Sequence, residues 1–252
     1  MVTDPVLEAI QDLVTSDSSG AVVTVIEGPE RGAKSVLDRE GSVLAGSLPG
    51  AMADAITRDA TVLIDRERSV TLGYEKSEVF YEVLAPRPHL FVFGAVHIAQ
   101  ELVAHASLLG FRTIVADPRP AFVTADRFPE ADELRVGWPD DVCDPEMLGP
   151  RTFIVVLTHD RRFEDPLWPI ALESPARYIG AMGSAKTTAR RRERLLADGF
   201  SVEQVDRIHG PIGLKIGSRT AGETAIAILA EMITARYVAN EPMALAGTPL
   251  RA

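Results

Sequence analysis

Short apolar runs alternate with charged and glycine-containing connections in the first third of the chain. Asp4 precedes Pro5, and apolar residues then recur at helical spacing as far as Val14, so we expect a short amphipathic helix there. A second helix is predicted near 51–57. The remaining apolar runs are of strand length and predict strands at 21–26, 35–37, 42–45, 61–64, 69–72 and 79–84. This mixture predicts a small α+β unit.

Two prolines, Pro86 and Pro88, separate this unit from a different pattern. Each proline fixes φ and removes a backbone N–H, so regular structure is interrupted. Beyond them, apolar strand-length runs alternate with amphipathic helices, which is typical of a parallel sheet. Strands are predicted at 90–93, 113–116, 152–157 and 177–179, and helices at 98–109, 186–197, 202–208 and 223–238. We therefore predict an α/β chain with a small N-terminal α+β domain over 1–86 and a Rossmann-like parallel-sheet domain over 87–252.

The first predicted strand of the second domain runs directly into a helix through residues 94–97. Such a turn presents backbone N–H groups and the positive end of a helix dipole, which together suit a phosphate. The dinucleotide-binding fingerprint has glycine where this chain has Val96, so a pyrophosphate would approach the backbone less closely. Asp117 ends the next strand, where such domains keep a ribose-binding acid, and Arg119 is placed to meet an additional phosphate. The alternative is a structural turn that contacts no ligand.

A second strand-to-helix turn is predicted at 180–184, where two glycines precede a serine that can cap the helix. Lys186, Arg190 and Arg194 follow at four-residue spacing and therefore share one helix face. A basic stripe beside a helix N-terminus suits an anionic ligand or partner. The alternative is a solvated face whose cations pair with surface acids.

Three histidines, His97, His159 and His209, lie at the ends of apolar or glycine-containing runs. Loops at the carboxyl ends of parallel strands converge on one crevice, so His97 and His159 are expected to meet there. No pair of histidines has the i, i+4 spacing of a helical metal motif, and no Gly-x-Ser-x-Gly segment is present. We therefore expect no metal site and no catalytic residues, and we assign the histidines structural or ligand-orienting roles.

The charge balance narrows the choice of partners. Lys and Arg number 26 against 36 for Asp and Glu, and the formal charge of −10 disfavours nucleic acid and anionic membrane surfaces. No apolar segment has the length of a membrane span and the N-terminus does not resemble a signal peptide, so we expect a cytoplasmic protein. The single cysteine, Cys143, lies among acidic residues and is predicted not to be a cofactor ligand.

Five segments between residues 77 and 238 form a recognisable pattern, because both their sequences and their order along the chain are distinctive. They are FVFGAVHIAQEL at 91–102, VADPRPAF at 115–122, LTHD at 157–160, RYIGAMGS at 177–184 and RIHGPIGLKIG at 207–217. Together they resemble the XdhC/CoxI family, whose members are accessory proteins of molybdenum hydroxylases. The resemblance implies a small N-terminal domain followed by a Rossmann domain, in agreement with the boundary at the two prolines.

The resemblance also implies a function and partners. Family members are understood to bind and protect the molybdenum cofactor and to help deliver it to a client molybdenum hydroxylase of the xanthine or carbon monoxide dehydrogenase type. Cofactor-maturation proteins are further expected partners, and a homodimer is the expected assembly. One branch carries Cys-Gly-Gly where this chain has residues 73–77, so thiolate ligation of molybdenum is excluded there. Lys215 occupies a position that resembles an aspartate position in relatives.

Two functions are open for the same crevice. The first is a stoichiometric binder of the molybdenum cofactor, in its molybdopterin or dinucleotide form, without turnover of its own. The alternative is an NAD(P)-dependent oxidoreductase with His97 or His159 as proton donor, which Val96 disfavours because it weakens the pyrophosphate turn. The predicted cofactor-binding residues are Gly94, Ala95, Val96, His97, Asp117, Arg119, Thr158, His159, Asp160, Gly180, Gly183, Ser184, Lys186 and His209.

Overall fold

The computed structural model of the chain describes residues 4–16, 18–158, 160–237 and 245–250. It divides into two compact units, with the boundary between Pro86 and Arg87. The C-terminal residues belong to the first unit, because β12 (Thr248–Pro249) pairs with β4 (Val70–Tyr74). The second domain therefore does not continue to residue 252 as the sequence analysis expected.

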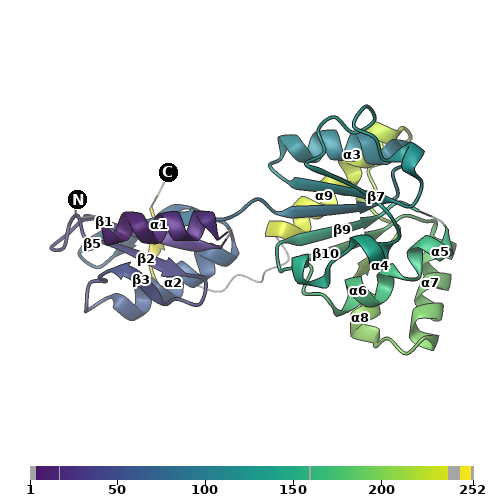
Figure 1. Cartoon of the computed structure of the whole chain (residues 1–252). Helices are drawn as coiled ribbons and strands as arrows, with labels where there is room; N and C mark the ends of the chain where they lie inside the picture. Colours follow the sequence, from purple (N-terminus) through teal and green to yellow (C-terminus); the bar gives the residue numbers. More distant parts are fainter. Residues whose placement is uncertain (1–3, 17, 159, 238–244, 251–252) are drawn as a thin grey trace. The chain divides into compact units, whose positions relative to one another are not determined.

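The first unit is an antiparallel sheet in the order β12-β4-β5-β1-β2-β3 (Figure 1). Its other elements are α1 (Pro5–Thr15), β1 (Gly20–Glu27), β2 (Lys34–Asp38), β3 (Val43–Gly46), α2 (Ala53–Asp65) and β5 (Ser77–Leu84). Adjacent residues of a strand point to opposite faces, so Val36 packs with α1 while Leu37 packs with α2. The sheet therefore has one helix on each face.

The helix α1 confirms its predicted cap, since the Val6 N–H donates to the Asp4 carboxylate over 3.0 Å. The predicted strand at 61–64 is wrong, because these residues complete α2. Ile56, Ala60 and Leu63 are fully buried and lie at the i, i+4, i+7 spacing of one helix face. The apolar end of a helix was therefore mistaken for a strand.

A buried carboxyl group ties the C-terminal segment to the first unit. Asp59 of α2 has no exposed surface, and its Oδ1 accepts the Ala246 N–H over 2.7 Å. Its Oδ2 accepts the Gly247 N–H over 2.8 Å and the Tyr74 hydroxyl over 2.6 Å. Burial and the hydrogen bond with Asp59 raise the pKa of the Tyr74 phenol. Both oxygens of one carboxyl therefore hold β12 beside β4.

We expect Asp59→Asn to loosen this segment. The amide keeps one acceptor oxygen but turns its NH2 group toward a backbone donor. This loss weakens the attachment of the segment by about 2 kcal/mol. Hydrogen exchange should then show faster exchange at Gly247 than in the unaltered protein. Asp65→Asn is the matched control, because Asp65 is exposed at the end of the same helix, where it pairs with Arg39. Equal protection of Gly247 in both variants would contradict the assignment.

The second unit is a parallel sheet in the order β11-β10-β9-β6-β7-β8. Numbered within the unit, this order is 6-5-4-1-2-3, the strand order of dinucleotide-binding domains. Its elements are β6 (His89–Phe93), α3 (His97–Leu108), β7 (Arg112–Asp117), β8 (Glu133–Val136), α4 (Pro139–Val142), β9 (Thr152–Val156), α5 (Arg161–Glu164), α6 (Leu167–Glu173), β10 (Tyr178–Ala181), α7 (Ala185–Ala197), α8 (Val202–Asp206), β11 (Ile208–His209) and α9 (Ala221–Tyr237). The prediction of a Rossmann-like sheet is confirmed.

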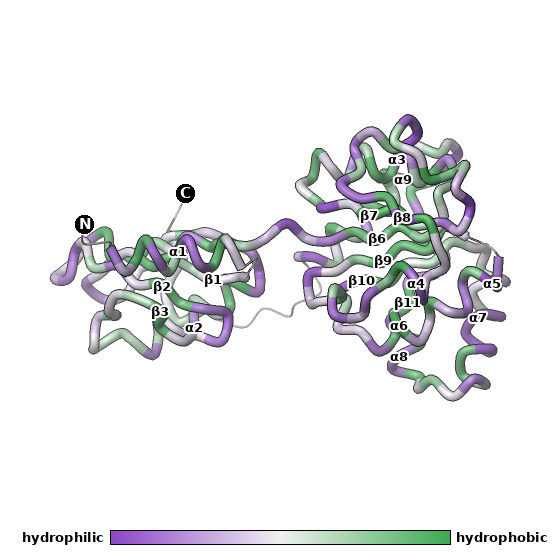
Figure 2. Tube along the Cα trace, viewed as in Figure 1, coloured by the Kyte–Doolittle hydropathy of each residue, from purple (hydrophilic) through white to green (hydrophobic). Residues whose placement is uncertain are grey.

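Helices cover both faces of this sheet (Figure 1). Alternate strand residues pack with α3 and α9 on one face and with α6, α7 and α8 on the other. The central strands are apolar along their length, whereas α7 is largely polar (Figure 2). No helix in the described ranges has the length and apolar character needed to cross a bilayer.

Candidate ligand-binding site

The turn between β6 and α3 is held by a glycine at its first position. Gly94 has a φ of +107°, a conformation that side chains rarely adopt. A Cβ there would also lie 3.1 Å from the Thr158 backbone nitrogen, at the end of the neighbouring β9. Val96 is the N-cap of α3 and supplies no capping side chain. The turn therefore lies directly against the loop after β9, at the carboxyl edge of the sheet.

Asp117, at the end of β7, fixes this turn from the other side. Its side chain is buried, and its Oδ2 accepts the Ala95 N–H over 2.9 Å. Arg119 donates three further hydrogen bonds, from its backbone N–H, Nε and Nη2, over 2.7–3.0 Å. Burial raises the pKa of the Asp117 carboxyl, but the hydrogen bonds from Arg119 and Ala95 outweigh it and hold the pKa below its usual value. Both oxygens are thus engaged within the protein.

A second aspartate–arginine pair of the same form follows β9. The Asp160 carboxylate accepts the Arg162 backbone N–H over 3.0 Å, Nε over 3.1 Å and Nη2 over 2.7 Å. It also caps the short helix α5. The hydrogen bonds with Arg162 lower the pKa of Asp160, and the charge of Arg119 contributes in the same direction. The two pairs are therefore close enough to interact electrostatically.

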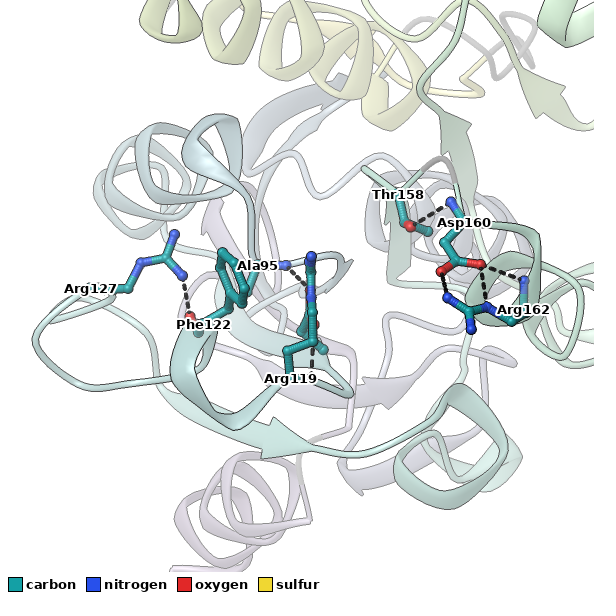
Figure 3. A network of polar contacts seen from close by, with 8 residues as sticks. Ala95, Arg119, Phe122, Arg127, Thr158, Asp160 and Arg162 are labelled. Atoms are coloured by element: carbon teal, nitrogen blue, oxygen red, sulfur yellow. Dashed lines mark hydrogen bonds and ion pairs between the residues drawn. The ribbon is translucent and has the colours of Figure 1, made fainter.

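A cavity of about 280 Å³ lies between these two pairs. Figure 3 shows Arg119 after β7 and Arg162 in the first turn of α5, with Thr158 beside the second pair. Trp138 and Phe163 form an aromatic wall, with ring centroids 6.2 Å apart. The lining residues are Asp117, Pro118, Arg119, Trp138, Thr158, Asp160, Arg162 and Phe163. The cavity thus opens where the loops after β7, β8 and β9 meet.

This arrangement suits a planar or anionic group. The guanidinium groups of Arg119 and Arg162 use Nε and Nη2 for their aspartates, and neither Nη1 donates a hydrogen bond within the described residues. Two donors on opposite sides of one cavity can share the oxygens of a phosphate. The aromatic wall offers a stacking surface for a ring. Asp117 and Asp160 fix the positions of the two guanidinium groups.

Four of the predicted site residues meet in this cavity: Asp117, Arg119, Thr158 and Asp160. Sequence reasoning missed Arg162, Trp138 and Phe163. The available signal for Arg162 was the repeated Asp-x-Arg spacing, because 160–162 repeats the pattern of 117–119.

His97 and the residues of the first turn lie outside this lining. His97 is exposed on α3, and its Nδ1 lies 3.1 Å from the Gln100 side-chain oxygen. Gly94, Ala95 and Val96 shape the first turn but do not line the cavity. His159 lies outside the described residues.

The second glycine turn is present, but its basic stripe is divided. Gly183 has a φ of +153°, and the Ser184 hydroxyl caps α7 by accepting the Thr187 N–H over 3.1 Å. Lys186 and Arg190 are exposed and form no ion pair with the described part of the chain. Arg194 instead pairs with Asp165 over 2.8 Å. None of these residues lines the cavity.

His209 belongs to a separate cluster on the edge strand β11. Its Nδ1 lies 3.6 Å from the Glu231 carboxylate, which also accepts the Tyr178 hydroxyl over 2.5 Å. Burial raises the pKa of Glu231, but the contact with His209 and the hydrogen bonds from Tyr178 and the Gly213 N–H outweigh it and lower the pKa. Gly180 is buried in β10, where a Cβ would meet Ile212 at 2.6 Å, so its role is packing. Neither residue reaches the cavity.

Cys143 is poorly suited to binding a metal ion. Burial raises the pKa of its thiol to about 11, so a thiolate is disfavoured there. Within residues 4–16, 18–158, 160–237 and 245–250, no three His, Cys, Asp or Glu side chains are grouped to hold a metal ion.

The strand order defines a Rossmann-type domain, with a candidate ligand site in the cavity at the carboxyl edge of its sheet. Residues 90–232, more than half of the chain, match the XdhC Rossmann domain, and the chain belongs to this family. The predicted family resemblance is confirmed.

Individual relatives agree with this assignment. A protein of Bacillus subtilis, named as a probable subunit of xanthine dehydrogenase, is 32% identical over 64% of this chain and 47% of its own length. The Escherichia coli molybdenum cofactor insertion chaperone PaoD is 26% identical over 64% of this chain and 44% of its own length. A crystal structure described as a xanthine dehydrogenase from Bacillus halodurans is 26% identical and superposes with a TM-score of 0.71, over 94% of this chain and 69% of that one. This chain spans less than half the length of those two curated relatives.

Proposed function

We propose that this protein is an accessory protein that binds the molybdenum cofactor as cargo and passes it to a client molybdenum hydroxylase. The observation that carries the proposal is the cavity between the Asp117–Arg119 and Asp160–Arg162 pairs. The cofactor is a pterin that bears a phosphate or a dinucleotide. Cations with free donors suit the phosphate, and the wall of Trp138 and Phe163 suits the ring.

The size of the cavity limits what it holds. At about 280 Å³ it falls just below the usual range for small-molecule sites, which begins near 300 Å³. It therefore accommodates the phosphate end and part of the pterin better than a complete dinucleotide. A partly exposed cargo is also what transfer to another protein requires. The protein's own residues bind and orient the cargo in this proposal, and none is assigned a chemical step.

The nicotinamide alternative has less support. A dinucleotide-binding domain uses the acid after its second strand to bind the ribose. Here the equivalent Asp117 directs both oxygens to Ala95 and Arg119, and only about 1% of its surface is exposed. A ribose contact would require those hydrogen bonds to break.

Arg162→Ala tests the proposal. We expect the purified variant to retain about tenfold less released molybdenum cofactor after gel filtration, because one charged donor to the phosphate is lost. The fold should be unaffected, since Arg162 is 80% exposed and its ion pair is at the surface. Arg39→Ala is the matched control, because Arg39 also forms an exposed pair, with Asp65 in the first unit. NAD(P) is tested in parallel.

Three outcomes have distinct meanings. Retention of the cofactor by the unaltered protein and by Arg39→Ala, with loss in Arg162→Ala, supports the proposal. Retention of NAD(P) in place of the molybdenum cofactor would replace it with the oxidoreductase alternative. Equal retention by all three proteins would show that the cofactor does not bind in this cavity. The homodimer, the cytoplasmic location and the maturation partners stay predictions.

A further inference from the structure

A second cavity, of about 240 Å³, lies between α7, α8 and the end of β11. It shares no lining residue with the cavity between the two aspartate–arginine pairs. Its lining residues are Thr188, Arg191, Arg192, Val205, Asp206, Ile208 and Gly210. It is also separate from Lys186 and Arg190, the exposed cations of the second turn.

Two buried polar groups of these lining residues have no partner in the described part of the chain. They are Nη1 of Arg191 and Oγ1 of Thr188. Arg191 is only 3% exposed, and its other nitrogens are used: Nε binds the Glu164 carboxylate, and Nη2 donates to the Met182 carbonyl over 3.0 Å. Buried polar groups in folded proteins nearly always have a partner. Two unsatisfied groups on residues around one cavity therefore point to a ligand that supplies acceptor oxygens.

The rest of the cavity wall indicates the shape of that ligand. Val205 and Ile208 are apolar, and Gly210 packs so closely on Thr188 that a Cβ there would lie 3.0 Å from the Thr188 hydroxyl oxygen. Arg192 and Asp206 form an ion pair of 2.9 Å and are about half exposed. An occupant with an anionic end and an apolar body would match both the donors and the apolar wall.

We propose that this second cavity binds a small organic anion, with its carboxylate or phosphate oxygens on Arg191 Nη1 and Thr188 Oγ1 and its apolar body against Val205 and Ile208. The inference is independent of the molybdenum cofactor, since the two cavities share no residue. The same guanidinium holds the Met182 carbonyl, immediately before Gly183. Binding therefore connects the second cavity to the β10–α7 turn.

Isothermal titration of the full chain with phenyl phosphate and, separately, benzoate tests this site. We expect saturable binding of one molecule per chain for at least one of the two probes. Thr188→Val removes the hydroxyl with little change in shape and should weaken that binding about tenfold, because a hydrogen bond to a charged group is lost. Thr234→Val is the matched control, since the Thr234 hydroxyl donates to a carbonyl on the exposed side of α9. Arg162→Ala should also bind as the unaltered protein does.

A second measurement needs no variant. The Nε–Hε signal of Arg191 in the nitrogen NMR spectrum should shift on saturation with the bound probe, while that of Arg39 stays in place. Absence of saturable binding for both probes would overturn the proposal. So would binding that neither responds to Thr188→Val nor moves the Arg191 signal. A failure of this site leaves the Arg162→Ala result unchanged, so the two proposals are tested separately.

Discussion

Arg191→Met is expected to lower the free energy of unfolding of the Rossmann unit by about 3–5 kcal/mol. The side chains of Arg191 and Glu164 are 3% and 5% exposed, so the substitution leaves a buried carboxylate without its cationic partner. Arg194 cannot replace it fully, because its Nη2 lies 3.8 Å from Glu164 and also serves Asp165. Removal of one partner of a buried pair costs far more than the pair itself contributes.

Both tryptophans, Trp138 and Trp168, lie in the Rossmann unit, so their fluorescence during urea unfolding reports on that unit alone. Arg192→Met is the control, because Arg192 forms an exposed pair with Asp206, and its loss should cost less than about 1 kcal/mol. The double variant Glu164→Leu with Arg191→Met should recover much of the stability, since no unpaired charge then remains. Equal urea midpoints for Arg191→Met and Arg192→Met would show that loss of the buried pair costs no more stability than loss of the exposed pair.

The central strands of the parallel sheet were predictable from the sequence. The apolar runs of β6, β7 and β9 are buried on both faces, and each is followed by a turn that ends the pattern. The edge strand β8 (Glu133–Val136) was missed because it is short and alternates charged with aliphatic residues. Helices α4 to α6 were missed because they have four to seven residues, too few for a helical period to show.

Only those site residues that lie at the ends of neighbouring central strands could be predicted from the sequence. Asp117 ends β7 and Thr158 follows β9, and these two strands lie on either side of the central β6, so convergence of the carboxyl ends brings the two residues together. His209 ends β11, at the opposite edge of the sheet from β8, and the strand order that separates it from the cavity is not evident from the sequence. Trp138 reaches the cavity from the loop after the missed strand β8. Tertiary order, rather than local pattern, determines which of the strand ends form one site.

Asp117→Ala is the second change with a large expected effect, about 3 kcal/mol in the stability of the Rossmann unit. The substitution leaves the Ala95 N–H buried without an acceptor and releases the Arg119 guanidinium. Ala95 of the first turn and Arg119 then lose the carboxylate that connects them. Retention of the molybdenum cofactor should therefore fall together with stability. Asp206→Ala, which removes an exposed carboxylate paired with Arg192, is the control for loss of a surface charge.

The pH dependence of this effect identifies the ionised form of Asp117 as its cause. The folded-state pKa of Asp117 is held below the unfolded value of about 4, so its carboxylate stabilises the fold above that pH and ceases to do so as the pH falls. The stability difference between the unaltered protein and Asp117→Ala, measured by tryptophan fluorescence in urea, should therefore be largest near neutral pH and shrink below about pH 4. A difference that stayed constant from pH 7 to about pH 3 would show that the shape of the side chain, and not its charge, holds the turn. In that case the aspartate–arginine pair would lose its role in orienting Arg119 toward the cavity.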